Sequence, residues 1–170
     1  MDFNIIEFCE ASHGSLINEL TEILHDAYRP LAEQGMRYMA THQPPDITLR
    51  RLKKGISFFG FSKNELIATI TLIKSDPTEP CNWYQKSEVY YFSQFAVKTN
   101  HQGLGFGKAL LNFIEKYAYQ NGAQELALDT SEHADELISM YKKRSYRFVE
   151  YANWDSTNYR SVILSKSLGE

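Results

Sequence analysis

The spacing of apolar side chains alternates along the chain between a period of two residues and a period near four, and each change marks a predicted element. Strand-like runs occur at residues 3–8, 56–61, 66–73, 89–97, 126–128, 148–154 and 159–168. Helical spacing occurs between them, at residues 16–27, 46–52, 108–121 and 137–141. The pattern predicts the order β-α-α-β-β-β-α-β-α-β-β, an α/β fold with helices packed on one mixed sheet. We expect a single domain that spans residues 1–170.

Polar and turn-forming residues indicate where these elements begin and end. Side chains suited to capping helices are Ser12 or Ser15, Asp46 and Ser131. Pro30 falls near the end of the first helix or kinks it. Residues 63–65 join two strands as a hairpin, and residues 32–45 have no clear period. We therefore expect residues 32–45 to form a mobile connection with a short helical turn.

The composition narrows the class of protein. Hydrophobic residues make up 43% of the 170 residues and charged residues 23%, which is typical of a globular domain. A net charge of −3 argues against binding to nucleic acid or to an anionic membrane surface. Cys9 and Cys81 lack metal-ligand spacing, so we expect reduced thiols and no metal site. The first ten residues do not resemble a signal peptide and no apolar run is long enough to cross a membrane, so we expect a cytoplasmic protein.

A glycine-rich turn, Gln102-Gly103-Leu104-Gly105-Phe106-Gly107, lies between the strand at 89–97 and the helix at 108–121. Glycines at such a turn let an anion approach the backbone, and the first amides of the helix then point at it. The dinucleotide-binding pattern fails because Lys108 stands where the third glycine or alanine belongs. The P-loop pattern fails because Ala109 follows Gly107-Lys108. The turn therefore predicts a different anion site, or a turn without a ligand.

The chain resembles the GNAT superfamily of acyl-CoA N-acyltransferases. Gln102, Gly105 and Gly107 match its central Q/R-x-x-G-x-G/A signature. Residues 92–97 are similar to the family's fourth strand, where a bulge splays the sheet, and residues 140–148 are similar to its Tyr-x-x-x-Gly-Phe segment. The chain departs from the family pattern at three places: Thr99 replaces a proline, Ser145 a glycine and Ala134 an asparagine.

The resemblance implies that acetyl-CoA is the acyl donor. The implied cofactor-binding residues are Phe95, Ala96 and Val97 for the pantetheine arm, and Gln102, Gly103, Leu104, Gly105, Phe106 and Gly107 for the pyrophosphate. The amide near Phe95 is the implied group that polarises the thioester carbonyl. Lys108 either supplements the phosphate site or is a solvated helix residue, and the same alternatives apply to Lys142 and Lys143 at the adenosine end.

The resemblance also implies a catalytic acid, Tyr141, which protonates the departing thiolate; the alternative is a core aromatic on the apolar face of its helix. Family positions for the base correspond to Tyr91 and Ser93, neither of which is a good base at neutral pH. Glu88 and Asp129 are the alternatives, each equally explained as a surface or capping carboxylate. His133 is a further candidate, and the amine can also arrive deprotonated.

Three functions follow as hypotheses. The first is N-acetylation of a primary amine on a small, amino-acid-like molecule that binds between residues 28–38 and 154–159. The second is acetylation of a protein N-terminus or lysine. The third is a non-catalytic acyl-CoA-binding module, because the usual carboxylate on the fourth strand is missing. The sequence leaves a homodimer open and predicts neither a nucleic-acid nor a membrane partner.

Overall fold

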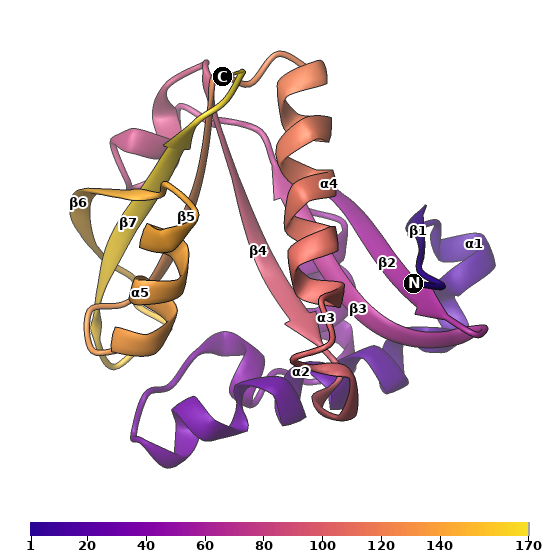
Figure 1. Ribbon diagram of the computed structural model, residues 1–170. Helices are drawn as coiled ribbons and strands as arrows, with labels where there is room; N and C mark the ends of the chain where they lie inside the picture. Colours follow the sequence, from indigo (N-terminus) through magenta and orange to yellow (C-terminus); the bar gives the residue numbers. More distant parts are fainter. Residues whose placement is uncertain (170) are drawn as a thin grey trace.

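The computed structural model describes residues 1–169, and its centre is one seven-stranded sheet (Figure 1). The strands are β1 (Asn4–Glu7), β2 (Ile56–Ser62), β3 (Glu65–Ile73), β4 (Val89–Val97), β5 (Glu125–Ser131), β6 (Arg147–Asn153) and β7 (Arg160–Ser167). They lie in the order β1-β2-β3-β4-β5-β7-β6. Neighbouring strands are antiparallel except for β4 and β5, which are parallel and joined through a helical crossover.

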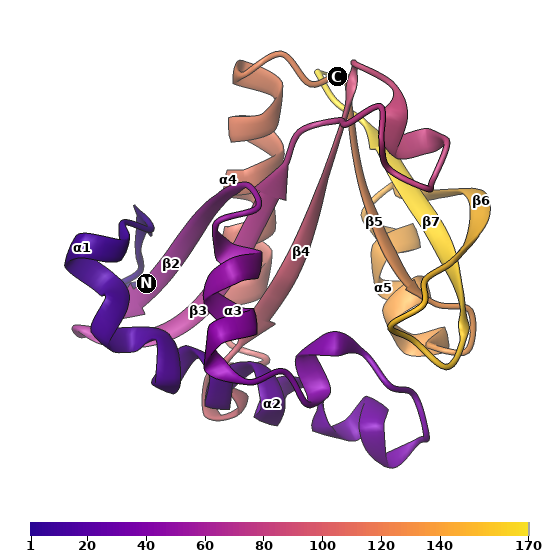
Figure 2. The same ribbon diagram turned by 180° about the vertical axis from the view of Figure 1, so that it is seen from behind.

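Helices cover both faces of the sheet. They are α1 (Glu10–His13), α2 (Ile17–Glu33), α3 (Pro45–Leu52), α4 (Phe106–Gln120) and α5 (Asp135–Lys143). Figure 1 shows α4 and α5 on one face, and Figure 2 shows α3 on the opposite face, with α2 across the end where β4 and β5 lie apart. Across residues 1–169, no helix is both long and apolar enough to cross a membrane.

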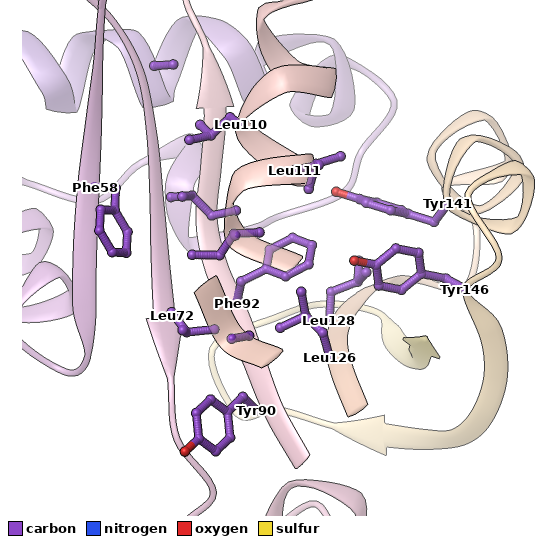
Figure 3. Packing of buried hydrophobic residues seen from close by; sticks show 14 of the residues in the cluster. Phe58, Leu72, Tyr90, Phe92, Leu110, Leu111, Leu126, Leu128, Tyr141 and Tyr146 are labelled. Carbon is purple, nitrogen blue, oxygen red and sulfur yellow. The ribbon is translucent and has the colours of Figure 1, made fainter. Parts of the chain in front are cut away.

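The alternation of side chains along the central strands builds a core on each face. Tyr90 and Phe92 of β4 and Leu126 of β5 pack toward α4, where they form the main cluster with Leu110 (Figure 3). Tyr91 lies on the other face with Tyr84 and Ala127. A sheet that is buried on both faces explains why its central strands are nearly continuous apolar runs.

The sheet is splayed between β4 and β5. Their pairing is confined to Val89–Tyr91 against Glu125–Ala127, after which β5 continues along β7 and β4 continues along β3. Opposite Ile70, β4 carries two residues, Gln94 and Phe95, because the register passes from Thr71↔Ser93 to Thr69↔Ala96. Gln94 has a left-handed φ of 50°. This bulge bends β4 away from β5 and confirms the expected splay.

The predicted order of elements is confirmed, with one addition at the N-terminus. Residues 10–33 form α1, a 3₁₀ turn and α2, and neither Ser12 nor Ser15 caps α2, whose N-cap is Leu16. Pro30 lies inside α2, which continues to Glu33. The hairpin at residues 63–65 is confirmed by the positive φ of Lys63 and Asn64.

Two other predicted caps are wrong. Pro44, rather than Asp46, is the N-cap of α3, and Asp46 lies in the first turn of the helix. Ala134, rather than Ser131, is the N-cap of α5. The Ser131 hydroxyl accepts the His133 amide at 3.1 Å, which uses it in a local turn before the helix begins.

Candidate active site

The glycine turn links the end of β4 to the start of α4. The Gln102 side-chain amide donates to the Val97 carbonyl at 2.9 Å and so holds the turn against β4. Gly103 and Gly105 have φ values of 75° and 92°, a left-handed conformation that favours glycine. Gly105 is the N-cap of α4, so the predicted helix start at Lys108 moves two residues earlier, to Phe106.

The N-terminus of α4 has the features of an anion site. No side chain caps it, and its first turn carries no acidic residue. A Cβ on Gly107 would lie 3.5 Å from both Phe95 Cζ and Val97 Cγ2, an ordinary contact distance. The chain therefore leaves uncapped amides at the positive end of a fifteen-residue helix, beside a position with no side chain.

A groove of about 990 Å³ runs between α4 and α5 and ends at this turn. Phe95, Gly107 and Lys108 line one end, and Ser145 and Lys166 line the other. A groove of this volume can hold a large elongated ligand whose anionic part reaches the start of α4. Of the ten residues that the resemblance implies for the cofactor, Phe95, Gly107 and Lys108 line the groove.

Charged residues of the groove differ in their partners. Glu115 Oε1 accepts Arg144 at 3.0 Å and the Tyr146 hydroxyl at 3.1 Å, and Glu115 Oε2 accepts Lys166 at 2.8 Å. Lys108 and Lys143 also line the groove, and neither forms an ion pair with residues 1–169. Lys142 is exposed and is not among the lining residues, so of the two lysines expected at the adenosine end only Lys143 borders the groove.

Tyr141 extends from α5 toward the wall of the groove formed by α4. Its hydroxyl points toward Leu111 in Figure 3, and its ring packs against Phe92 and Tyr146. The residue is 4% exposed, and no side-chain partner within residues 1–169 hydrogen-bonds its hydroxyl. Burial raises its pKa well above the ordinary value, so the phenol stays protonated at neutral pH. Tyr141 is therefore a core aromatic whose proton remains available.

Residues at the bulge in β4 make contacts on both faces of the sheet. The Phe95 side chain lines the groove, whereas its carbonyl accepts the Tyr28 hydroxyl of α2 at 3.0 Å. The Val97 carbonyl is occupied by Gln102. Ala96 packs on the α2 side of the sheet, in a cluster separate from the groove.

Asp129 lies on β5 beyond the last pair with β4, on the face opposite α4. Tyr84 donates to its carboxylate at 2.9 Å and stacks on Tyr91, with ring centroids 3.9 Å apart. Burial raises the pKa of Asp129 and outweighs the lowering by the Tyr84 hydrogen bond and by the charge of Arg51. A partly accessible carboxylate with a raised pKa is typical of a proton acceptor.

The structure does not bring Glu88 near Asp129 or the bulge in β4. Glu88 precedes β4 at the closed end of the splay, where its carbonyl accepts the amides of Gln124 and Glu125. Glu88 precedes Phe95 by seven positions, which corresponds to about 23 Å along an extended strand. His133 is exposed beside Glu132, the Tyr91 hydroxyl donates to Glu79 at 2.6 Å, and Ser93 is half-buried on β4.

Two tyrosines span the open end of the splay. Tyr28 donates to Phe95 of β4, and Tyr38 lies 2.7 Å from Thr130 Oγ1 and accepts the Ser131 amide of β5 at 3.1 Å. The centroids of the two tyrosine rings lie 5.4 Å apart. We call this pair the tyrosine bridge.

The two segments expected to border the acceptor meet at this bridge. Tyr38 packs on Tyr159, with ring centroids 4.9 Å apart. The Arg37 amide donates to Asn158 Oδ1 at 2.8 Å, and Asn158 Nδ2 donates to the Gly35 carbonyl at 2.8 Å. Residues 28–38 and 154–159 are therefore in contact, although they are far apart in sequence.

Arg51 of α3 is a further residue at this site, and no motif in the sequence singles it out. Its guanidinium donates to Gln43 Oε1 at 2.6 Å and is half-buried near Tyr28, Asp129 and Tyr159. Its position in the helix was the one available signal. Residue 51 follows Thr48 by about one helical turn, so it lies near the buried side of α3.

Comparisons with known proteins agree with this geometry. The family model described as "Acetyltransferase (GNAT) family" matches residues 17–146. The chain is 26% identical over 130 residues to S-(2-succino)cysteine N-acetyltransferase of Bacillus subtilis (strain 168), covering 75% of this chain and 76% of that protein.

Solved structures share the fold. Protein PH1933 of Pyrococcus horikoshii OT3 superimposes with a TM-score of 0.75 at 18% identity, covering 99% of both chains. A GNAT family acetyltransferase of Elizabethkingia anophelis with acetyl-CoA bound superimposes with a TM-score of 0.67 at 16% identity, covering 98% of this chain and 99% of that chain. Because the family model covers well over half of the residues, and the splay and turn follow the same pattern, this chain belongs to the GNAT acetyltransferase family and is an N-acetyltransferase.

Proposed function

We propose that the protein transfers an acetyl group from acetyl-CoA to the primary amine of a small, amino-acid-like molecule, by direct attack in a ternary complex. The observation that carries the proposal is the two-sided splay between β4 and β5. The groove and the uncapped start of α4 lie on one face, whereas Asp129 and the tyrosine bridge lie toward the other. A donor and an acceptor that approach from opposite faces would meet at the bulge.

The donor would bind along the groove with its pyrophosphate at the amides of residues 102–107 and its pantetheine arm beside residues 95–97. Gly107 supports this arrangement because it leaves the backbone open next to Phe95. The carbonyls of Phe95 and Val97 already accept side-chain hydrogen bonds. We therefore assign the polarisation of the thioester carbonyl to the Phe95 amide.

In the transfer step, the neutral amine attacks the thioester carbonyl, a C–N bond forms and the C–S bond breaks. Asp129 takes the proton that the amine loses, directly or through water, because its raised pKa suits a base. Tyr141 gives its proton to the departing thiolate. Glu88 lies too far along β4 for the same role.

The acceptor is proposed to be small for two reasons. The tyrosine bridge links both strands at the open end of the splay, which restricts an extended peptide more than a compact molecule. The Bacillus subtilis relative is named for the N-acetylation of S-(2-succino)cysteine, an amino-acid derivative. Acetylation of a protein N-terminus or lysine remains the competing outcome of the test.

Thiol release from acetyl-CoA tests the proposal. The panel contains the proteinogenic L-amino acids, S-(2-succino)cysteine, spermidine, kanamycin and a lysine-containing peptide with a free N-terminus. We expect turnover with at least one small amine and little with the peptide. Preference for the peptide would support the protein-acetylating alternative, and donor binding without turnover across the panel would support a non-catalytic module.

The variant Tyr141→Phe tests the acid. We expect kcat to fall about 100-fold or more with unchanged affinity for CoA, in the range for loss of a general acid. Tyr146→Phe is the matched control, because Tyr146 is an equally buried neighbour whose hydroxyl already donates to Glu115. Equal kcat in wild type and Tyr141→Phe, with chemistry limiting the rate, would remove Tyr141 from the mechanism.

A further inference from the structure

Arg51 differs from the other arginines in its partners. Five arginines lie within 4.0 Å of a carboxylate, namely Arg29, Arg50, Arg144, Arg147 and Arg160. Arg37 is exposed to solvent. Within residues 1–169, Arg51 is half-buried and no carboxylate lies within that distance. A half-buried guanidinium without a counter-ion is costly, and a negatively charged ligand would offset that cost.

A polar network fixes where the guanidinium lies. Gln43, which is fully buried, accepts Arg51 at 2.6 Å and donates to Thr48 at 2.8 Å and to Gln94 at 2.7 Å. Gln94 is the bulge residue that precedes Phe95. Arg51 is therefore held in register with the bulge through one of its five N–H groups, which leaves the rest of its planar fork for a ligand.

The groups around Arg51 belong to both sides of the splay. Burial lowers the pKa of Arg51, and the negative charge of Asp129 raises it. The positive charge of Arg51 in turn lowers the pKa of Asp129. Arg51 on α3 and Asp129 on β5 are therefore close enough for their charges to interact, but they do not form an ion pair.

We propose that Arg51 binds a carboxylate of the acceptor, so that the substrate is a molecule that carries both an amine and a carboxylate, such as an α-amino acid or its derivative. This inference rests on the proposed function and narrows its acceptor. Asp129 would face the amine while Arg51 holds the acid in a two-pronged contact. An acceptor that carries only positive charges and no carboxylate, such as a polyamine, would leave the guanidinium without a partner.

A purely structural role for Arg51 makes a different prediction. If its function were to support Gln43 and the bulge, its loss would slow the acetylation of every acceptor alike. If it binds a carboxylate, its loss would raise the KM of acids and leave amines without a carboxylate unaffected. The comparison between matched acceptors therefore separates the two roles.

The test uses S-carboxymethyl-L-cysteine, S-(2-succino)cysteine, each proteinogenic L-amino acid that is turned over, and the α-carboxamide of each. Wild type, Arg51→Gln and Arg51→Lys are compared, with Arg50→Gln as the control because Arg50 is the exposed neighbour in the same helix. We expect wild type and Arg50→Gln to prefer the acid over its amide at least tenfold in kcat/KM. Arg51→Gln should lose that preference through KM, with unchanged KM for acetyl-CoA, and Arg51→Lys should retain part of it.

Two results would overturn the inference while leaving the proposed function intact. One is a wild-type enzyme that acetylates amides, or spermidine, as well as it does the acids. The other is an Arg51→Gln variant that keeps the wild-type preference for acids. Absence of turnover with every amine counts instead against the proposed function, and the carboxylate inference would then fail with it. Calorimetric binding of CoA checks the folding of the variants. Calorimetric binding of N-acetyl-S-carboxymethyl-L-cysteine must be weaker in Arg51→Gln than in wild type and Arg50→Gln.

Discussion

The substitution Gly107→Ala separates the stability of α4 from its ability to hold an anion. Gly107 is the second residue of α4, and the new methyl group would lie 3.5 Å from Phe95 Cζ and Val97 Cγ2. These are ordinary contacts, and φ at Gly107 is not left-handed, so no strain opposes the change. Because alanine favours a helix over glycine, we expect the variant to be more stable by about 0.5–1 kcal/mol.

The same methyl group would contact the Phe95 and Val97 side chains, and the family signature accepts alanine as well as glycine at this position. Loss of one hydrogen bond to a charged group costs about 1.5–3 kcal/mol. That free energy corresponds to a roughly 10- to 150-fold weaker affinity for CoA. Because the methyl group leaves the backbone amides in place, Gly107→Ala is expected to raise stability while CoA affinity changes by less than this amount.

Urea unfolding measures the first effect and isothermal titration with CoA the second. Gly14→Ala is the control, because Gly14 has helical dihedral angles and lies in the N-terminal segment, outside the groove. It should gain a similar stability and bind CoA as wild type does. A Gly107→Ala protein that loses tenfold or more in CoA affinity would refute the reasoning, because the methyl group would then displace the pyrophosphate from the helix amides.

Three further predictions follow from single residues. Ser145 has φ of 72° after α5, so Ser145→Gly should raise the free energy of unfolding by about 0.5–1 kcal/mol, measured in urea; no gain would show that the left-handed serine is unstrained. A Cβ on Gly55 would lie 2.1 Å from the Leu72 carbonyl oxygen, so Gly55→Ala should cost about 3 kcal/mol in the same assay, and a loss below about 1 kcal/mol would contradict the packing described. Because Asp129 must be ionised to accept a proton and its pKa is raised, kcat/KM should fall as the pH drops through a value above that of an ordinary aspartate. Asp129→Asn should lose this fall of kcat/KM at low pH, together with most of the activity. A fall that persists in Asp129→Asn, or whose midpoint follows the pKa of the acceptor amine, would exclude Asp129 as its source.

The backbone geometry of the glycine turn could be predicted from the sequence, whereas the contacts on the acceptor side could not. Gly103 and Gly105 require left-handed dihedral angles at a strand-to-helix turn, a local demand that leaves a visible mark in the sequence. Strand β4 was predicted with its observed bounds because seven of its nine residues are apolar or aromatic. Local patterns of this kind predict local structure well, because contacts with distant residues change it little.

Helix ends and the acceptor side depend on contacts between distant residues. Ser131 has the chemistry of a cap, but its hydroxyl is engaged in an earlier turn. The proposed role of Arg51 depends on its contact with Gln43 and on its proximity to Asp129, which lies 78 positions later in the chain. No local sequence pattern indicates this proximity. Tyr28 and Tyr38 fell within the expected acceptor segment, but their bridge across two strands required the fold.

The short pairing between β4 and β5 bears on how the protein folds. Strands β2 and β3 pair through a tight hairpin and β4 is the next strand along the chain, so these three can form early from contacts that are near in sequence. The parallel contact of β4 with β5 requires the α4 crossover first and supplies only three registered pairs. A nascent chain would therefore complete Tyr28–Phe95 before Tyr38–Thr130, and the space between Arg51 and Asp129 would exist only once the C-terminal strands had docked. We expect acetyl transfer to report the fully folded state alone, since no partly folded form contains both walls of the site.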